Sequence, residues 1–189
     1  MQFVHSFTMK DGAPCLLRHL TAADGQAEYE LYALTHAQSP YLTGYPDENT
    51  HTPEKNAEDL ERAAEDPSRL ELGAFVNGRL VGSASMAGVG RKDKVRHRCR
   101  IGLSVEESFC SRGIGRALME GCIASARQAG YVQAELDVAA ENARALGLYT
   151  KLGFTEFARN PLEWRTREGR WQEVVYMRLV LRPEETRKG

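Results

Sequence analysis

An apolar run, a glycine-rich turn and a helical pattern follow one another in the middle of the chain, and no other feature constrains the fold as strongly. RIGLSV predicts a strand, CSRGIG a turn, and the pattern after it a helix that stops at Gly130. The first N–H groups of a helix lack intrahelical partners, and glycine lets an anion approach them. Gly113 and Gly115 therefore predict a phosphate-binding turn. Arg112 and Arg116 would add charged hydrogen bonds at its rim, while tight helix-on-sheet packing is the alternative explanation of the glycines.

Two common nucleotide-binding motifs do not fit this turn. Leu118 stands where the dinucleotide motif GxGxxG has its last glycine. No Lys-Ser or Lys-Thr pair follows the glycines, as a Walker loop requires. The anion expected at the turn therefore belongs to another kind of ligand.

Length, composition and charge favour an ordinary globular protein. The 189 residues are 42% hydrophobic and 27% charged, and no repeat or low-complexity linker divides them, so we expect one domain over residues 1–189. The formal net charge of −1 gives no general attraction for nucleic acid or an anionic membrane. The basic segment Arg91–Arg100 leaves a nucleic-acid-binding protein as an alternative, although such a segment is more often a solvated sheet edge.

The cysteines and the first residues bear on the location of the protein. Four cysteines without CxxC spacing predict reduced thiols rather than a disulfide framework or a zinc site. His97 and Cys99 face one side of a predicted strand, but two ligands alone do not make a metal site. The chain does not start with a basic end and an apolar run, and no stretch approaches about 18 apolar residues. We therefore expect a cytoplasmic protein without a metal or a membrane partner.

Turn residues and apolar periodicity predict the other elements. Asp11-Gly12 and Asn77-Gly78 lie between β-prone runs and predict hairpins. Helices are expected to begin after Thr21, Thr52 and Asn142. The expected inner faces of the first two are Ala23, Ala27, Leu31 and Leu34, and then Ala57, Leu60 and Ala64. The order of elements predicts an antiparallel meander followed by a strand-helix-strand unit with one parallel strand pair.

The glycine-turn segment and a second segment about thirty residues later resemble the GNAT family of N-acyltransferases. The resemblance is most specific in Leu103–Arg116 and Asn142–Phe154, and the order of elements extends it over about residues 10–181. The family pattern has Gln or Arg, two residues, Gly, one residue, then Gly or Ala, and Gly113 and Gly115 match it. The resemblance implies an α+β or α/β fold, the GNAT acyl-CoA N-acyltransferase fold, with a central mixed, mostly antiparallel sheet of about seven strands flanked by about four helices.

The resemblance also implies acetyl-CoA as the cosubstrate. In the family the pyrophosphate lies on the turn, here Ser111–Arg116, and the pantetheine arm pairs like an added strand with Leu103–Val105. Cys110 stands where the family has Gln or Arg, which costs one side-chain contact at most because the site works through backbone N–H groups. Gly102 fits either close backbone approach or simple packing. The implied cofactor-binding residues are Leu103, Ser104, Val105, Cys110, Ser111, Arg112, Gly113, Ile114, Gly115, Arg116, Asn142 and Tyr149.

Acyl transfer to an amine calls for an acid, a carbonyl polariser and a base. Tyr149 matches the family tyrosine near the cofactor sulfur, and a phenol of pKa about 10 can protonate a thiolate whose parent pKa is about 8.5. The Val105 N–H matches the family contact to the thioester carbonyl. Asp137 matches the catalytic carboxylate of the ribosomal-protein-alanine acetyltransferases, although theirs is Glu and the shorter Asp would act through a water.

Several of these roles have rivals. Glu135, Glu106 and Glu107 are alternative bases. Asn142 matches a family asparagine that bonds the pantetheine arm, and it is also the expected N-cap of the next helix. Tyr149 would also be explained by simple packing.

The sequence thus predicts an N-acetyltransferase that moves an acetyl group from acetyl-CoA to a primary amine of a small molecule or a protein N-terminus by direct attack. Residues 39–51 and 160–170 are expected to select the acceptor, whose identity stays open. We expect the side chains of Trp164 and Trp171 to line either the acceptor cleft or the interface of a homodimer. The alternative is a GNAT-fold sensor or docking module that binds acyl-CoA without turnover, against which Tyr149 argues.

Overall fold

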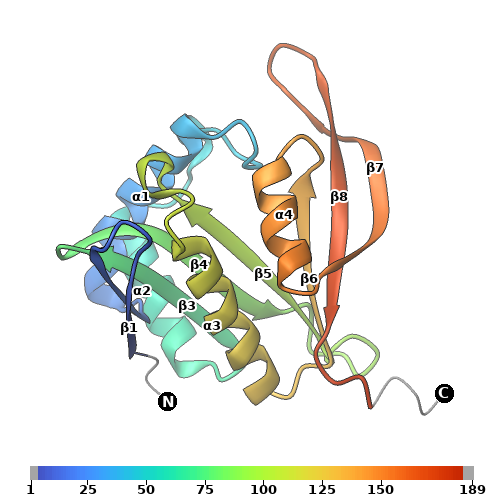
Figure 1. The fold of residues 1–189 in the computed structure, drawn as a ribbon, viewed down its shortest axis with the longest axis horizontal. Coiled ribbons are helices and arrows are strands. Elements are labelled where there is room, and N and C mark those ends of the chain that lie inside the picture. The colour runs from blue at the N-terminus through green and yellow to red at the C-terminus, as the bar shows by residue number, and fades with distance from the viewer. Residues whose placement is uncertain (1–3, 185–189) are drawn as a thin grey trace.

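A mixed sheet of eight strands forms the centre of the molecule in the computed structural model, which describes residues 4–184 (Figure 1). The strand order is β1-β2-β3-β4-β5-β6-β8-β7, and β5 and β6 form the parallel pair. The strands are β1 Val4–Thr8, β2 Pro14–His19, β3 Arg69–Val76, β4 Arg79–Gly88, β5 Arg98–Val105, β6 Gln133–Ala139, β7 Thr155–Arg165 and β8 Trp171–Val180. The mixed, mostly antiparallel sheet is confirmed, with eight strands instead of about seven because a hairpin closes each edge.

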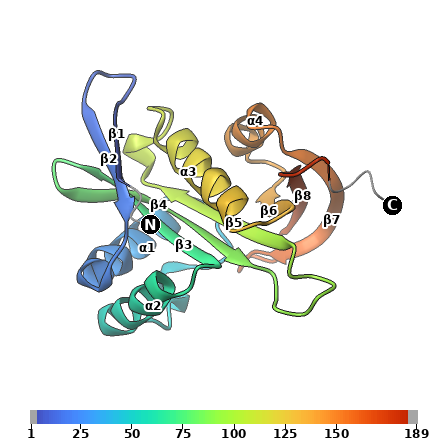
Figure 2. The ribbon, with the colours of Figure 1, turned by 90° about the horizontal axis from the view of Figure 1, so that it is seen from below.

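Four helices cover the two faces of this sheet (Figure 2). They are α1 Gly25–Gln38, α2 Pro53–Glu65, α3 Ile114–Gln128 and α4 Ala143–Lys151. Three short 3-10 turns, η1 Ala22–Asp24, η2 Pro46–Glu48 and η3 Glu107–Phe109, lie in the connections. α1 and α2 lie on one face and α3 and α4 on the other, so the expectation of about four helices is confirmed. The assignment of residues 1–189 to one domain stays a prediction, and its two ends lie outside the described residues.

Turn and cap residues fix the element boundaries as their chemistry predicts. Asn77 and Gly78 have φ values of 51° and 78°, the positive pair that a tight hairpin turn requires. The Thr52 side chain accepts a hydrogen bond from the Lys55 N–H and caps α2. Gly130, with φ of 88°, follows the end of α3 in the left-handed conformation.

The predicted inner faces of the first two helices need correction at one residue each. Ala23 is exposed because it belongs to η1 rather than to α1, and Asp24 is buried in its place, hydrogen-bonded to Arg18. Ala64 is exposed and its neighbour Ala63 packs inward. The buried stripe of α2 is Asn56, Leu60 and Ala63.

The last hairpin also differs from the prediction. β7 continues through Arg165, so residues 160–170 are strand for half their length and only the remainder is a turn. Pro161, which reads as a loop residue, is tolerated because β7 is an edge strand and its register with β8 is irregular between Asn160 and Trp164.

The larger hydrophobic core lies between the sheet and α3. Ile114, Leu118 and Met119 of α3 are fully buried against Leu72 and Met86 of the central strands. A smaller cluster of Leu20, Leu31, Leu60, Phe75 and Leu80 lies beneath α1 and α2. The face under α1 and α2 therefore has the smaller apolar core.

Candidate active site

The parallel strands β5 and β6 pair over only part of their length. Their register joins Arg98–Arg100 to Gln133–Glu135 and then stops, although β5 stays paired with β4 up to Val105 and β6 with β8 up to Ala139. The two strands diverge beyond this point (Figure 1). The backbone N–H and C=O groups of the later β5 and β6 residues therefore do not hydrogen-bond to each other, and β5 can accept an added strand.

The turn between β5 and α3 places N–H groups beside this opening. Ser111 and Gly113 have φ values of 64° and 103°. The Ala117 N–H donates to the Gly113 carbonyl, so the N–H groups of Ile114–Arg116 precede that bond. No side chain caps α3 in the described structure. Such a turn binds anions, and the positive φ of Ser111, which the sequence did not reveal, is a strain of the kind found at functional sites.

The structure gives different reasons for the presence of glycine at the two positions of the turn. Gly113 is required by its positive φ. A Cβ on Gly115 would lie 3.5 Å from both Leu103 and Leu148, an ordinary contact that packing would allow. Packing alone therefore does not explain Gly115. The same contact shows that α4, which carries Leu148, lies against the turn, so the two segments of the sequence resemblance meet in space.

Both arginines of the turn form exposed ion pairs. The Arg112 guanidinium lies 2.6 Å from the Asp11 carboxylate, and the Arg116 guanidinium lies 3.1 Å from that of Glu120. Such pairs are weak at the surface, since water screens both charges. An arriving phosphate can therefore replace either carboxylate as the partner of the guanidinium.

Tyr149 is buried on α4 close to the opening, with 7% of its surface exposed. Burial raises the pKa of its hydroxyl to about 12, and the negative charge of Asp137 adds to the shift. The ring packs at 6.0 Å from that of Phe154. Tyr149 thus satisfies the packing interpretation and also keeps its proton at neutral pH, as a general acid must.

The predicted bases differ in how strongly neighbouring arginines bind their carboxylates. Asp137 is partly exposed and its carboxylate lies 3.5 Å from the Arg100 guanidinium. Glu135 is buried and both its oxygens accept from Arg98, which lowers the pKa of its carboxyl. Glu135 therefore belongs to a structural ion pair with Arg98 and is not free to act as a base.

Of the two glutamates after β5, Glu106 has its carboxylate committed elsewhere. The Glu106 carboxylate accepts from Arg79 at 2.6 Å and from Ser108 at 2.7 Å, and the Arg79 bond lowers its pKa. Glu107 is exposed, and its N–H donates to the Gln38 side chain. Asp137 is the predicted carboxylate whose charge acts on Tyr149, so it remains the best placed for proton transfer.

The other predicted residues lie around the same opening. The Asn142 side chain accepts from the Ala145 N–H at 3.1 Å, as an N-cap does. The Cys110 thiol lies 3.7 Å from the Val105 carbonyl, and burial raises its pKa, which disfavours the thiolate that a nucleophile requires. Leu103, Ser104 and the Val105 backbone follow along β5.

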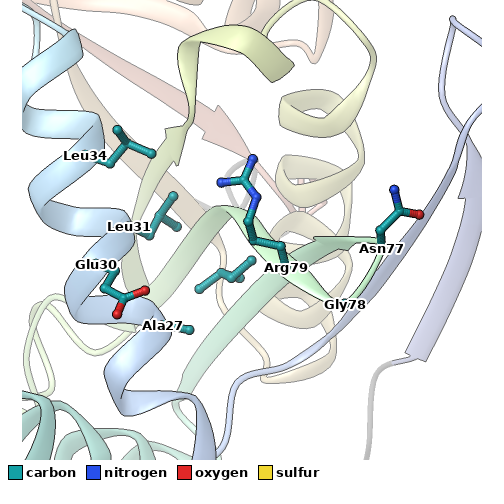
Figure 3. Close-up of a pocket in the computed structure, with 8 residues that line it drawn as sticks. Ala27, Glu30, Leu31, Leu34, Asn77, Gly78 and Arg79 are labelled. Carbon is teal, nitrogen blue, oxygen red and sulfur yellow. The ribbon is translucent and has the colours of Figure 1, made fainter.

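Two hollows lie away from these residues. The larger, of about 490 Å³, lies between α1 and the β3–β4 hairpin, where Glu30 and Arg79 stand on opposite walls (Figure 3). The second, of about 360 Å³, borders β2. Neither is lined by a predicted site residue. Within residues 4–184 no cluster of three His, Cys, Asp or Glu side chains is placed to hold a metal, and no helix is long and apolar enough to span a membrane.

Known proteins share this fold and parts of this sequence. L-amino acid N-acyltransferase MnaT of Escherichia coli K12 is 30% identical over 105 residues, 56% of this chain and 60% of MnaT. The [ribosomal protein bS18]-alanine N-acetyltransferase of the same strain is 33% identical over 79 residues, 42% of this chain and 53% of that protein. The structure of yncA from Salmonella typhimurium with acetyl-CoA has a TM-score of 0.78 and 24% identity, covering 88% of this chain and 94% of that one. The chain thus spans less than two thirds of the length of these two curated relatives.

The diverging parallel strands, the uncapped helix after a glycine turn and the tyrosine beside it define a fold of the N-acyltransferase class. The chain belongs to the acetyltransferase (GNAT) family, which it matches over residues 29–154.

Proposed function

We propose that the protein is an N-acetyltransferase that transfers an acetyl group from acetyl-CoA to a primary amine. One observation carries the proposal: the glycine turn before α3 opens beside the unpaired edge of β5, and α4, which carries the protonated Tyr149, lies against that turn. The yncA structure, which shares the fold, was solved with acetyl-CoA.

The residues present fit acetyl-CoA. The N–H groups of Ser111–Arg116 would bind the pyrophosphate, with Arg112 and Arg116 exchanging their exposed carboxylate partners for phosphate oxygens. The free backbone edge of Leu103–Val105 would pair with the pantetheine arm, which requires no particular side chain there. The Asn142 amide would donate to the arm with its NH₂ group, because its oxygen is already used as the helix cap.

The proposed chemistry is direct attack by the amine. The Val105 N–H polarises the thioester carbonyl, Tyr149 donates its proton to the departing sulfur, and Asp137 draws the proton from the amine. Cys110 has no part as a nucleophile, since burial keeps its thiol protonated.

The acceptor class is the open part of the proposal. MnaT is named for L-amino acids and the bS18 relative for a protein alanine, so an amino acid or a protein N-terminus are the acceptors to test first. The cytoplasmic location and the homodimer are proposals of the same standing. The absence of a basic net charge supports small-molecule or protein acceptors rather than nucleic acid.

The experiment is a calorimetric titration with acetyl-CoA, followed by thiol release with a panel of amino acids and of peptides with free N-termini. Binding with amine-dependent thiol release is expected. Binding without release by any amine would support the second candidate, an acyl-CoA sensor with the same fold, and absence of binding would overturn both.

A further inference from the structure

Two buried polar atoms without hydrogen-bond partners lie in one region beneath α1 and α2. Within the described chain they are Oε2 of Glu28 and Nε of Arg69. Glu71 connects them, because it bonds Arg69 at 3.2 Å and its pKa responds to the charge of Glu28. Unpartnered buried polar atoms are rare in proteins and mark a place where water or a ligand completes the bonding. Two together indicate a polar site on this face of the sheet.

A chain of hydrogen bonds leads from this region to β5. Oε1 of Glu28 accepts from the Ser83 hydroxyl at 3.1 Å, and the Ser83 and Ser104 hydroxyls are 3.4 Å apart. Ser83 of β4 is directly opposite Ser104 of β5 in the sheet register. The chain therefore joins a buried carboxylate to the part of β5 that does not pair with β6.

The two faces of β5 differ in what they offer to an arriving molecule. Leu103 and Val105 point to the α3 face, where they meet Gly115. Ser104 points to the α1 face, because strand side chains alternate, and Gly102 on the same face is exposed. Tyr149 lies in the core on the α3 side. A proton acceptor on the α1 face and the phenol on the α3 side therefore flank β5, as direct displacement needs.

We propose that Glu28 receives the proton of the attacking amine through Ser83 and Ser104. This inference rests on the proposed function and replaces Asp137 as the final proton acceptor. The amine nitrogen gives a proton to the Ser104 oxygen, Ser104 passes its own to Ser83, and Ser83 passes its own to Glu28. The nitrogen lone pair forms the new C–N bond, the C–S pair leaves with sulfur, and Tyr149 supplies the proton that sulfur takes up. Solvent then takes the extra proton from Glu28 and returns a proton to Tyr149.

The surroundings of Glu28 make its carboxylate a stronger base than an ordinary glutamate. Burial raises the pKa of its carboxyl and the charge of Asp24 on its own side adds to this, while the Ser83 bond opposes it. Glu71 faces it from β3 beside Arg69, and Asp59 of α2 acts on Glu71 in turn. A base whose pKa lies closer to the working pH is more effective than an ordinary carboxylate.

The test compares four variants of the full chain with acetyl-CoA and the best amine found for the wild type. Glu28→Gln removes the proton acceptor and Ser83→Ala breaks the chain. Glu30→Gln is the matched control on the same helix, where it is exposed and bonded to Gln26. Ser85→Ala is the control on β4, two residues from Ser83 and on the same face. Asp137→Asn is measured beside them.

We expect kcat to fall about 100-fold in Glu28→Gln and at least about 10-fold in Ser83→Ala, with KM for acetyl-CoA unchanged. The acidic limb of the pH profile of kcat should disappear in Glu28→Gln, which a purely structural role would not cause. Both controls should stay within about 2-fold of the wild type.

Full activity with an unchanged acidic limb in Glu28→Gln, or loss of that limb only in Asp137→Asn, would overturn the relay and leave the proposed function standing. If Glu28→Gln fails to fold, the pH profile of Ser83→Ala decides in the same way. A wild type that releases no thiol with any amine would overturn the proposed function and the relay together.

Discussion

At the scale of single residues, Tyr149 offers the most direct test of the chemistry. Its hydroxyl is the proposed proton donor to sulfur, so Tyr149→Phe should lower kcat about 100-fold while acetyl-CoA binds as before. Steady-state thiol release and calorimetry measure the two quantities.

Tyr131→Phe is the matched control, since Tyr131 is equally buried and its hydroxyl donates to the Ser68 carbonyl instead. It should lose about 1 kcal/mol of stability and keep its kcat. Equal kcat in Tyr149→Phe and the wild type would remove Tyr149 from the mechanism.

Glu71 predicts how the free energy of unfolding depends on pH. Burial raises the pKa of its carboxyl from 4.5 to about 7. Between these values the folded protein holds a proton that the unfolded chain releases, so the free energy of unfolding falls as pH rises through this window. The full effect is about 3 kcal/mol, from about 1.4 kcal/mol per pKa unit.

Glu71→Gln should remove most of that loss. Urea unfolding at pH 5 and pH 8 measures the difference for each protein, which cancels any change in the neighbouring Arg69 contact. Glu61→Gln, an exposed glutamate on α2, should keep the wild-type pH dependence. A Glu71→Gln protein that loses as much stability as the wild type between pH 5 and pH 8 would contradict the assignment.

At the scale of elements, a substitution in the glycine turn should weaken ligand binding without destabilising the fold. Gly115→Ala fits the surrounding side chains and improves a helical position, so stability should stay level or rise by about 0.5–1 kcal/mol. Glycine at this position also lets an anion approach the turn closely, so the added methyl should raise the Kd for acetyl-CoA at least about 10-fold. Gly147→Ala in α4, where a Cβ meets no atom within 4 Å, should bring the same stabilisation without the binding loss. Calorimetry and thermal unfolding of both variants test this, and an unchanged Kd in Gly115→Ala would argue against phosphate at the turn.

The sequence predicted those elements whose ends are set by local chemistry. The Asn77-Gly78 hairpin, the Thr52 cap and the glycine after α3 depend on residues within a few positions of each other, so their signals are complete in the sequence. The inner faces at Ala23 and Ala64 failed by one residue because Ala23 belongs to η1, where Asp24 is buried, and because Asn56, Leu60 and Ala63 form the buried stripe of α2.

The site was predictable only where it follows one stretch of chain. The glycine turn and Tyr149 lie in two compact motifs, which the structure brings together through Gly115 and Leu148. The Glu28–Ser83–Ser104 chain joins residues that are 55 and 21 positions apart. Such contacts arise from sheet register and helix placement, for which no single segment carries a signal.

At the scale of the whole molecule, the two segments expected to select the acceptor contact each other. Arg167 of the β7–β8 turn donates to Asp47 of the α1–α2 connection at 2.7 and 2.9 Å, and its guanidinium lies 4.0 Å from the centre of the Tyr45 ring. The Gln172 amide donates to the Pro40 carbonyl at 3.2 Å. These contacts join the helical face to the far hairpin of the sheet, and we expect them to hold one wall of the acceptor site.

Arg167→Ala should therefore raise KM for the amine several-fold and leave both kcat and the Kd for acetyl-CoA unchanged. Its stability should hardly change, because exposed ion pairs contribute little. Arg159→Ala is the control, since Arg159 lies on β7 with a similarly exposed pair to Glu156. Raising ionic strength should increase KM in the wild type but not in Arg167→Ala, because salt screens the Asp47 pair that the variant already lacks. If KM for the amine responds equally to salt in both proteins, the contact between the two segments does not shape the acceptor site.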